Sequence, residues 1–136
     1  MNILDENLME SQTQILRGWH IKVQRIGHEV GFLGMKDDEI ILFLHQLRYP
    51  AFFTRDLGFY ERLPCHPNYC IVSLSVCQQE VASFIRSFLK HPAFDNNRKR
   101  IGKVVRISHV EYEYGSYMLK RKTKLHGILN QYRKLK

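Results

Sequence analysis

The sequence has little of what would mark a secreted or membrane-bound protein. Its three cysteines are an odd number without framework spacing, so we expect reduced thiols rather than disulfides. The longest apolar run covers residues 40–44, far short of the roughly 20 residues that cross a bilayer. The N-terminus lacks the basic stretch and apolar segment of a secretory signal. We therefore expect a cytoplasmic protein with no membrane partner, and its 136 residues predict a single domain.

Carboxylates are also scarce, because 13 Asp and Glu stand against 21 Lys and Arg. Residues 1–94 hold nine basic and ten acidic side chains, whereas residues 95–136 hold twelve and three. This asymmetry predicts a near-neutral body with a basic C-terminal extension, and nucleic acid is the commonest partner for such a segment. A solvated basic surface, or a segment that docks on an acidic protein, is the alternative. The candidate nucleic-acid contacts are Arg98, Lys99, Arg100, Lys120, Arg121 and Lys122.

Short β-rich segments alternate with helical ones, which predicts an α/β fold with a parallel sheet flanked by helices. The predicted strands are 2–4, 21–25, 51–54 and 69–76, and the predicted helices are 9–19, 37–47 and 78–90. Segments 26–36 and 57–68 are predicted loops, and 95–100 a polar linker.

The basic extension itself predicts a strand at 103–108, a hairpin partner at 110–118 and a helix after residue 120. Four apolar residues of that helix have helical spacing, and they either pack over the sheet or pair with a second copy of the chain in a homodimer. They are Leu125, Ile128, Leu129 and Tyr132.

Three acidic clusters lie at the ends of apolar runs. Asp5-Glu6 follows the first predicted strand, Asp56 follows the third, and Asp37-Asp38-Glu39 opens a helix. Ligands of open α/β sheets bind beyond the carboxyl ends of the strands, and carboxylates gathered there repel one another unless a cation joins them. Hard oxygen ligands of this kind suit Mg²⁺ or Mn²⁺. The combination predicts a metal-dependent phosphodiester cleavage site, although each cluster alone fits an ordinary helix start or turn.

These segments, taken in order, resemble the small prokaryotic PIN-like proteins. The run Asn-Ile-Leu-Asp-Glu-Asn-Leu at 2–8 is similar to their first strand, which ends in Asp-Glu-Asn. Asp-Asp-Glu-Ile at 37–40 is similar to their Asp-Glu-Glu-Ile helix start. Phe-Thr-Arg-Asp at 53–56 is similar to their Val-Thr-Arg-Asp strand end, with an aromatic following at Phe59. Gly-His-Glu-Val at 27–30 is more loosely similar to a family segment, and the resemblance covers about residues 1–90.

The resemblance implies a PIN-like Rossmannoid domain over residues 1–94, with residues 95–136 packed on it or swapped between copies. It implies a Mg²⁺- or Mn²⁺-dependent ribonuclease, often the toxin of a toxin–antitoxin pair, so that RNA and an antitoxin protein are the expected partners. Carried over by position, catalytic and metal-binding roles fall on Asp5, Asp37 and Asp56, with Glu6 and Asp38 as neighbouring ligands.

One departure from the family pattern concerns the residue two positions after Asp56. The family often has a further Asp there, and this chain has Gly58, which leaves the site one carboxylate short unless Glu61 replaces it. Fewer carboxylates hold Mg²⁺ less firmly. The alternative function is therefore a catalytically weak or inactive PIN-like module that binds RNA or a protein through its basic extension.

Three further groups of residues have two interpretations each. Arg55 either pairs with a neighbouring carboxylate, which we favour, or contacts phosphate. The cysteines and histidines either bind zinc or have structural and surface roles. The second is favoured, because they match no standard zinc spacing. The tyrosines of the predicted hairpin could stack on single-stranded RNA, but ordinary strand packing is favoured; they are Tyr112, Tyr114 and Tyr117.

Overall fold

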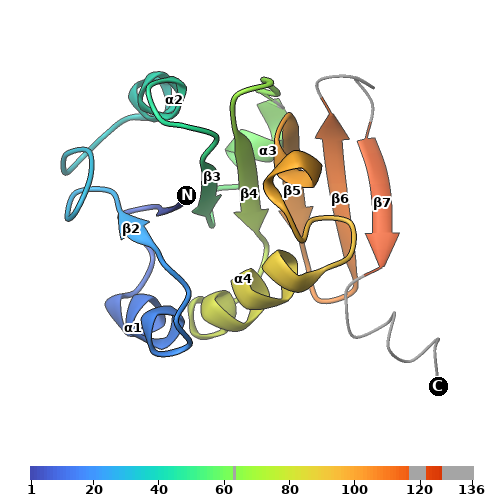
Figure 1. Cartoon of the computed structure of the whole chain (residues 1–136), viewed down its shortest axis with the longest axis horizontal. Helices are drawn as coiled ribbons and strands as arrows, with labels where there is room; N and C mark the ends of the chain where they lie inside the picture. The colour runs from blue at the N-terminus through green and yellow to red at the C-terminus, as the bar shows by residue number, and fades with distance from the viewer. Residues whose placement is uncertain (63, 117–121, 127–136) are drawn as a thin grey trace.

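A single seven-stranded sheet runs through the protein in the computed structural model, which describes residues 1–62, 64–116 and 122–126 (Figure 1). The strand order is β2-β1-β3-β4-β5-β6-β7. Neighbouring strands from β2 to β5 are parallel, and β6 and β7 extend the sheet antiparallel to their neighbours. The strands are β1 (Asn2–Leu4), β2 (Gln24–Arg25), β3 (Ala51–Thr54), β4 (Cys70–Leu74), β5 (Lys103–Ile107), β6 (Glu111–Ser116) and β7 (Lys122–His126).

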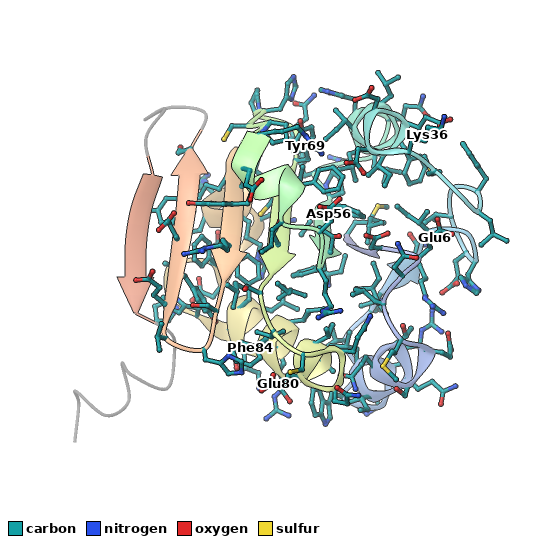
Figure 2. All side chains as sticks on the ribbon, turned by 180° about the vertical axis from the view of Figure 1, so that it is seen from behind. Glu6, Lys36, Asp56, Tyr69, Glu80 and Phe84 are labelled. Carbon is teal, nitrogen blue, oxygen red and sulfur yellow. The ribbon has the colours of Figure 1, made fainter. Side chains whose placement is uncertain are left out.

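Helices cover both faces of the parallel strands, which confirms the predicted α/β architecture. In Figure 1, α4 crosses the near side of the sheet and α3 lies on the far side. Figure 2 shows the sheet from the side of α3. The helices are α1 (Glu10–Gly18), α2 (Asp37–His45), α3 (Gly58–Arg62), the 3₁₀ turn η1 (Gln78–Glu80), α4 (Val81–Lys90) and α5 (Asn97–Arg100).

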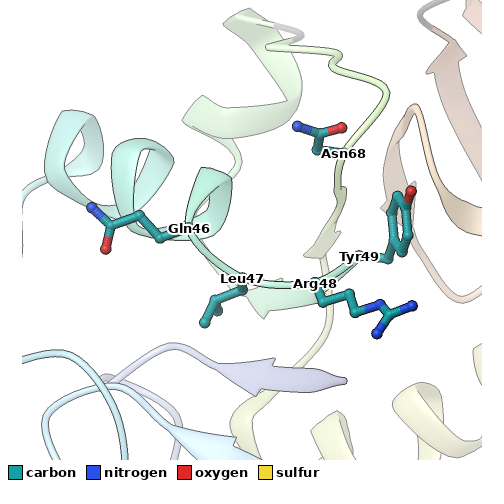
Figure 3. A pocket seen from close by; sticks show the side chains of 5 residues that line it. All are labelled: Gln46, Leu47, Arg48, Tyr49 and Asn68. Atoms are coloured by element: carbon teal, nitrogen blue, oxygen red, sulfur yellow. The ribbon is translucent and has the colours of Figure 1, made fainter.

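The connection from α2 to β3 forms a shallow cavity of about 340 Å³ at the end of the sheet where the parallel strands begin (Figure 3). Tyr49 adopts a positive φ of 50° there, in the region that only a few non-glycine residues occupy. The side chains that line the cavity are Gln46, Leu47, Arg48, Tyr49 and Asn68.

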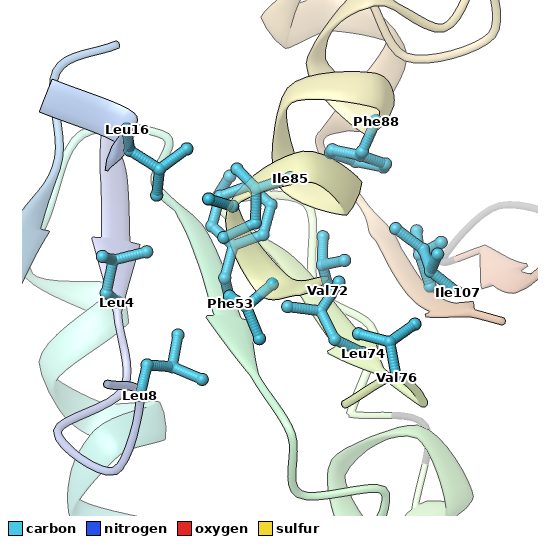
Figure 4. Close-up of a cluster of buried hydrophobic side chains, with 14 of the residues drawn as sticks. Leu4, Leu8, Leu16, Phe53, Val72, Leu74, Val76, Ile85, Phe88 and Ile107 are labelled. Atoms are coloured by element: carbon cyan, nitrogen blue, oxygen red, sulfur yellow. The ribbon is translucent and has the colours of Figure 1, made fainter. Parts of the chain in front are cut away.

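The central strands are apolar at nearly every position because each face is covered by helices. Alternate side chains of β3 show this: Phe52 packs with the α2 and α3 side, and Phe53 with the α1 and α4 side. Figure 4 shows the second of these clusters, in which Phe53 lies near Ile85 and Phe88 of α4. The Phe53 and Phe88 rings meet edge to face at 5.8 Å.

Three segments differ from the sequence-based expectation. The predicted loop 57–68 contains α3, whose Phe59 and Tyr60 are buried against the sheet. The predicted linker 95–100 contains α5, a single turn capped by the Asn96 side chain. Residues 122–126 form β7, so the predicted helix is wrong at Leu125, and its other three apolar residues lie outside the described part of the chain.

The basic extension contributes strands to the same sheet as residues 1–94. β5 pairs along β4 from Ile71–Val104 to Leu74–Ile107, and the β6–β7 hairpin continues from it. Tyr112 is only 1% exposed and packs in the core, which agrees with strand packing rather than RNA stacking. Tyr117 lies outside the described residues.

None of the helices in the described residues combines the length and the apolar composition needed to span a bilayer.

Replacing Phe53 with alanine should lower the free energy of unfolding by about 3–5 kcal/mol, because the side chain is fully buried and leaves a cavity. Phe32→Ala is the matched control: that ring is 52% exposed, so its loss should change stability by about 0.5 kcal/mol or less. Urea unfolding of the two variants measures the difference, and equal losses would contradict the assigned core.

Candidate active site at the carboxyl ends of β1 and β3

The sheet order creates a topological switch point between β1 and β3. The chain leaves β1 for β2 on one side and later enters β3 on the other, so the connections from the two strands diverge. A crevice at such a point is where open α/β sheets bind their ligands. Asp5 directly follows β1, and Asp56 lies two residues after β3. Two of the predicted acidic residues therefore come to this point from neighbouring strands.

Asp5 is held rigidly between the two strands. Its backbone N–H donates to the Phe53 carbonyl at 2.9 Å, and its Oδ2 accepts a 2.6 Å hydrogen bond from the Thr54 hydroxyl. Asp5 is 8% exposed and Thr54 is fully buried. Thr54 is not among the site residues predicted from the sequence. Its position between the buried residues of β3 and Arg55-Asp56 is a signal that could have indicated its role.

Burial raises the pKa of the Asp5 carboxyl above its usual value. The hydrogen bonds from Thr54 and from the backbone of Asn7 and Glu6 oppose that shift in the pKa, and the Glu6 charge adds a little to it. The repulsion that we expect among gathered carboxylates does not come from Asp37 or Asp56 in this shift of the pKa. Instead, desolvation is the main cause and Glu6 is the carboxylate that contributes.

Asp56 is connected to Asp5 through the same threonine. The Asp56 backbone N–H donates to Thr54 Oγ1 at 3.0 Å, and its carbonyl accepts from the Ser73 hydroxyl at 3.1 Å. Its Oδ1 accepts from the Gly58 backbone N–H at 2.8 Å, which fixes the exposed carboxylate against the start of α3. Thr54 thus joins the carboxylate of Asp5 to the turn that carries Asp56.

Gly58 lies close to two charged side chains. A Cβ added at this position would lie 2.9 Å from Asp56 Oδ1 and 3.2 Å from Arg62 Nη1. Both of these atoms are the ends of flexible side chains that can move to make room for a Cβ, so packing does not require glycine at this position. The Arg62 guanidinium therefore lies beside the position that a side chain at residue 58 would occupy.

Asp37 pairs with an arginine, whereas the acidic clusters predicted a metal ion as its partner. Its Oδ2 accepts from Arg62 Nη2 at 2.7 Å in a partly exposed ion pair. Asp37 and the exposed Asp38 face a cavity of about 450 Å³ between α2 and α3. Asp37 begins α2 where an acidic residue favours the helix dipole, and Arg62 on α3 satisfies its charge.

Glu6 holds the loop before α2 rather than pointing freely into solvent. Both of its carboxylate oxygens accept from the Gly34 backbone N–H, at 2.9 and 3.1 Å. Gly34 has a φ of 79°, which L-residues rarely adopt, so glycine is the natural residue at this contact. Figure 2 shows Glu6 beside this loop. Within the described part of the chain, no three Asp, Glu, His or Cys side chains form a group that could hold a metal ion.

The predicted basic contacts lie at the other end of the sheet where they are described. α5 precedes β5, and its Lys99 bonds Asp95 and the Pro92 carbonyl, both at 2.8 Å. Arg100 is partly buried and donates to the Phe94 and Leu89 carbonyls. Arg98 remains exposed on this turn. Lys120 and Arg121 lie outside the described residues, and Lys122 begins β7.

Comparisons with models of protein families, curated proteins and solved structures find no match to this chain. The chemistry of the site is therefore inferred from its own residues.

The raised pKa of Asp5 predicts that its ionised carboxylate destabilises the metal-free fold. The folded state binds this proton more tightly than the unfolded state, whose value is near 3.8, so stability falls as pH rises from that value through the folded pKa. Asp5→Asn should raise the melting temperature at pH 7 in EDTA, by roughly 3–5 °C for each kcal/mol relieved. The gain should disappear near pH 3, where the parent carboxyl is protonated.

Asp38→Asn is the control for that measurement. It removes an exposed charge that the α2 dipole favours, so the melting temperature at pH 7 should fall slightly rather than rise. Thermal unfolding of both variants at pH 3 and pH 7 gives the comparison, and a lower melting temperature for Asp5→Asn at pH 7 would contradict the assignment.

Proposed function

We propose that this protein is a Mg²⁺- or Mn²⁺-dependent ribonuclease of PIN-like type, with Asp5 and Asp56 as its catalytic carboxylates and Asp37 as a further ligand. The observation that supports this best is Asp5 itself. A carboxylate that is almost fully buried at the switch point of an α/β sheet is costly to keep ionised, and a bound cation would compensate for that cost.

The donor set fits Mg²⁺ in one specific way. Mg²⁺ commonly keeps several waters and takes one or two carboxylates together with substrate phosphates. Asp5 and Asp56 supply two carboxylates from neighbouring strand ends, with Thr54 between them. Asp37 would join them only after release from Arg62. When bound, the metal supplies a Lewis acid and a water of lowered pKa.

The residues around these carboxylates have positioning roles. Thr54 holds Asp5 in one orientation by donating to its Oδ2, and Gly58 holds Asp56 by donating to its Oδ1. Ser73 fixes the backbone of Asp56 from β4. Because these bonds exist before any ligand arrives, little ordering remains to be done on binding.

The basic extension is the part of the chain that we propose to contact RNA outside the cleavage site. Arg98 is exposed, and it has no carboxylate within ion-pair distance among the residues that the structure describes. Lys120, Arg121 and Lys122 complete the proposed contact, whereas Lys99 and Arg100 are already engaged. Phosphate contacts of this kind add affinity without sequence preference.

The biological role that goes with this activity is that of a cytoplasmic toxin whose partner is an antitoxin protein. Its support is the resemblance of residues 1–90 to the small PIN-like proteins, together with the acidic residues at the switch point.

The purified protein should cleave single-stranded or structured RNA with Mg²⁺ or Mn²⁺, and EDTA should stop the reaction. Asp5→Asn and Asp56→Asn should each reduce the rate by about 100-fold or more, because each removes a charged ligand but keeps its shape. Thr54→Val should cost about 10- to 100-fold, as expected for a residue that orients a ligand. Gel-based cleavage assays at fixed metal concentration measure all three.

Glu29→Gln is the matched control, since this carboxylate pairs with Arg17 outside the acidic site. Its rate should equal that of the parent. Undiminished cleavage by both Asp5→Asn and Asp56→Asn, or no cleavage by the parent with either metal, would refute the proposed activity.

The Asp37–Arg62 ion pair favours a second candidate, a module that binds RNA or a protein without cleaving it. The Arg62 guanidinium already supplies Asp37 with the positive charge that a bound metal would otherwise supply. In that case the acidic residues have a structural role, and binding depends on the basic extension.

Arg62→Gln tests whether Asp37 is a metal ligand or only the partner of Arg62. If Asp37 is a metal ligand, removing its partner should raise Mn²⁺ affinity by up to about fivefold, the range of an exposed ion pair. Arg17→Gln is the control, because it removes a comparable exposed pair with Glu29 outside the site. Calorimetric Mn²⁺ titration gives both affinities, and an unchanged value for Arg62→Gln would remove Asp37 from the ligand set.

A further inference from the structure

Arg55 has an anchored guanidinium at the same end of the sheet as the acidic residues. Its Nε donates to the Val76 carbonyl at 2.9 Å, so the side chain reaches from the end of β3 to the segment that follows β4. The residue is exposed. This bond uses only one of the five N–H donors of arginine, and Nη1 and Nη2 carry the other four.

The charge of Arg55 is not neutralised by a carboxylate in the described residues, in contrast to that of four other arginines. Four arginines form ion pairs with carboxylates, whereas Arg55 has no carboxylate within 4.0 Å in the described ranges 1–62, 64–116 and 122–126. The expected pairing with a neighbouring carboxylate is therefore replaced by a bond to a backbone carbonyl. The four paired residues are Arg17, Arg25, Arg62 and Arg106.

The backbone on both sides of Arg55 is fixed by the site itself. Thr54 donates to Asp5, and Asp56 donates to Thr54 and accepts from Ser73. An exposed cation is ordinary on a protein surface, and Arg48 is a comparable arginine at the opposite end of the sheet. Arg55 differs in that it stands between Thr54 and Asp56 in the chain, just after β3, and is itself held by a hydrogen bond.

We propose that Arg55 binds a phosphate of the RNA backbone beside Asp5 and Asp56, through Nη1 and Nη2. The inference rests on the proposed function and adds the residue that receives the substrate. Asp5, Glu6 and Asp56 carry up to three formal negative charges here, and each would repel a phosphodiester. A planar guanidinium matches two phosphate oxygens at once, and it is already positioned by the Val76 carbonyl.

The test is RNA binding by the full chain in EDTA, where no metal-dependent cleavage can occur. A fluorescently labelled single-stranded oligoribonucleotide is titrated at several salt concentrations with the parent and with Arg55→Gln, Arg55→Lys and Arg48→Gln. Arg55→Gln should bind about tenfold more weakly, the order expected for a charge-assisted contact. Its plot of log K against log salt should be shallower by about 0.7, the value for one phosphate on a single strand.

The conservative variant and the matched control sharpen that result. Arg55→Lys keeps the charge but loses the planar pair of donors, so it should recover the salt slope and only part of the affinity. Arg48→Gln should bind as the parent does if the contact is specific to the acidic site. Parent-like affinity and slope in Arg55→Gln, with an unchanged melting temperature, would overturn the proposal.

Cleavage measured on the same variants separates this inference from the proposed function. If the parent never cleaves RNA, but Arg55→Gln still binds RNA more weakly and with a smaller salt dependence, the phosphate contact is supported and the nuclease activity is refuted. If the parent cleaves and Arg55→Gln keeps the same kcat and KM, the nuclease stands and the role of Arg55 is refuted. Loss of kcat/KM in Arg55→Gln, with the parent active, supports both.

Discussion

The hydrogen bond from the Thr54 hydroxyl to the Asp5 carboxylate is the contact on which the candidate site depends. It joins β1 to β3 where their connections diverge, and it offsets part of the cost of burying a carboxylate. The same oxygen accepts from the Asp56 backbone, so one buried hydroxyl orients two acidic residues. Thr54 is fully buried, so its hydroxyl makes both bonds away from solvent.

Charge at this end of the sheet is divided between two arginines with different environments. Arg62 forms an ion pair with Asp37, and its guanidinium lies beside Gly58. Arg55 is anchored by a carbonyl instead and keeps its charge for an external anion. The balance between acidic and basic groups is therefore set by side chains that approach from three separate elements.

Elements with a strong local signal were predicted well, and short ones were not. The apolar runs of β1 and β3 and the amphipathic stripe of α4 were found close to their actual bounds, because burial on one or both faces leaves a clear pattern. α3 was missed because five residues beginning at a glycine are too few to show a helical period. Residues 122–126 were expected to be helical, but pairing with β6 makes them a strand.

The sequence by itself determined the α/β class and the positions of the acidic residues just beyond strand ends. Both are local properties, since apolar runs and the residue that follows a strand are recognised along the chain. Only the tertiary structure decided that Asp37 pairs with Arg62, that Thr54 bonds Asp5, and that Arg55 reaches past β4. Those partners are 21 to 49 residues apart in sequence. Which of them meet depends on strand order and helix placement, and no local pattern specifies either one.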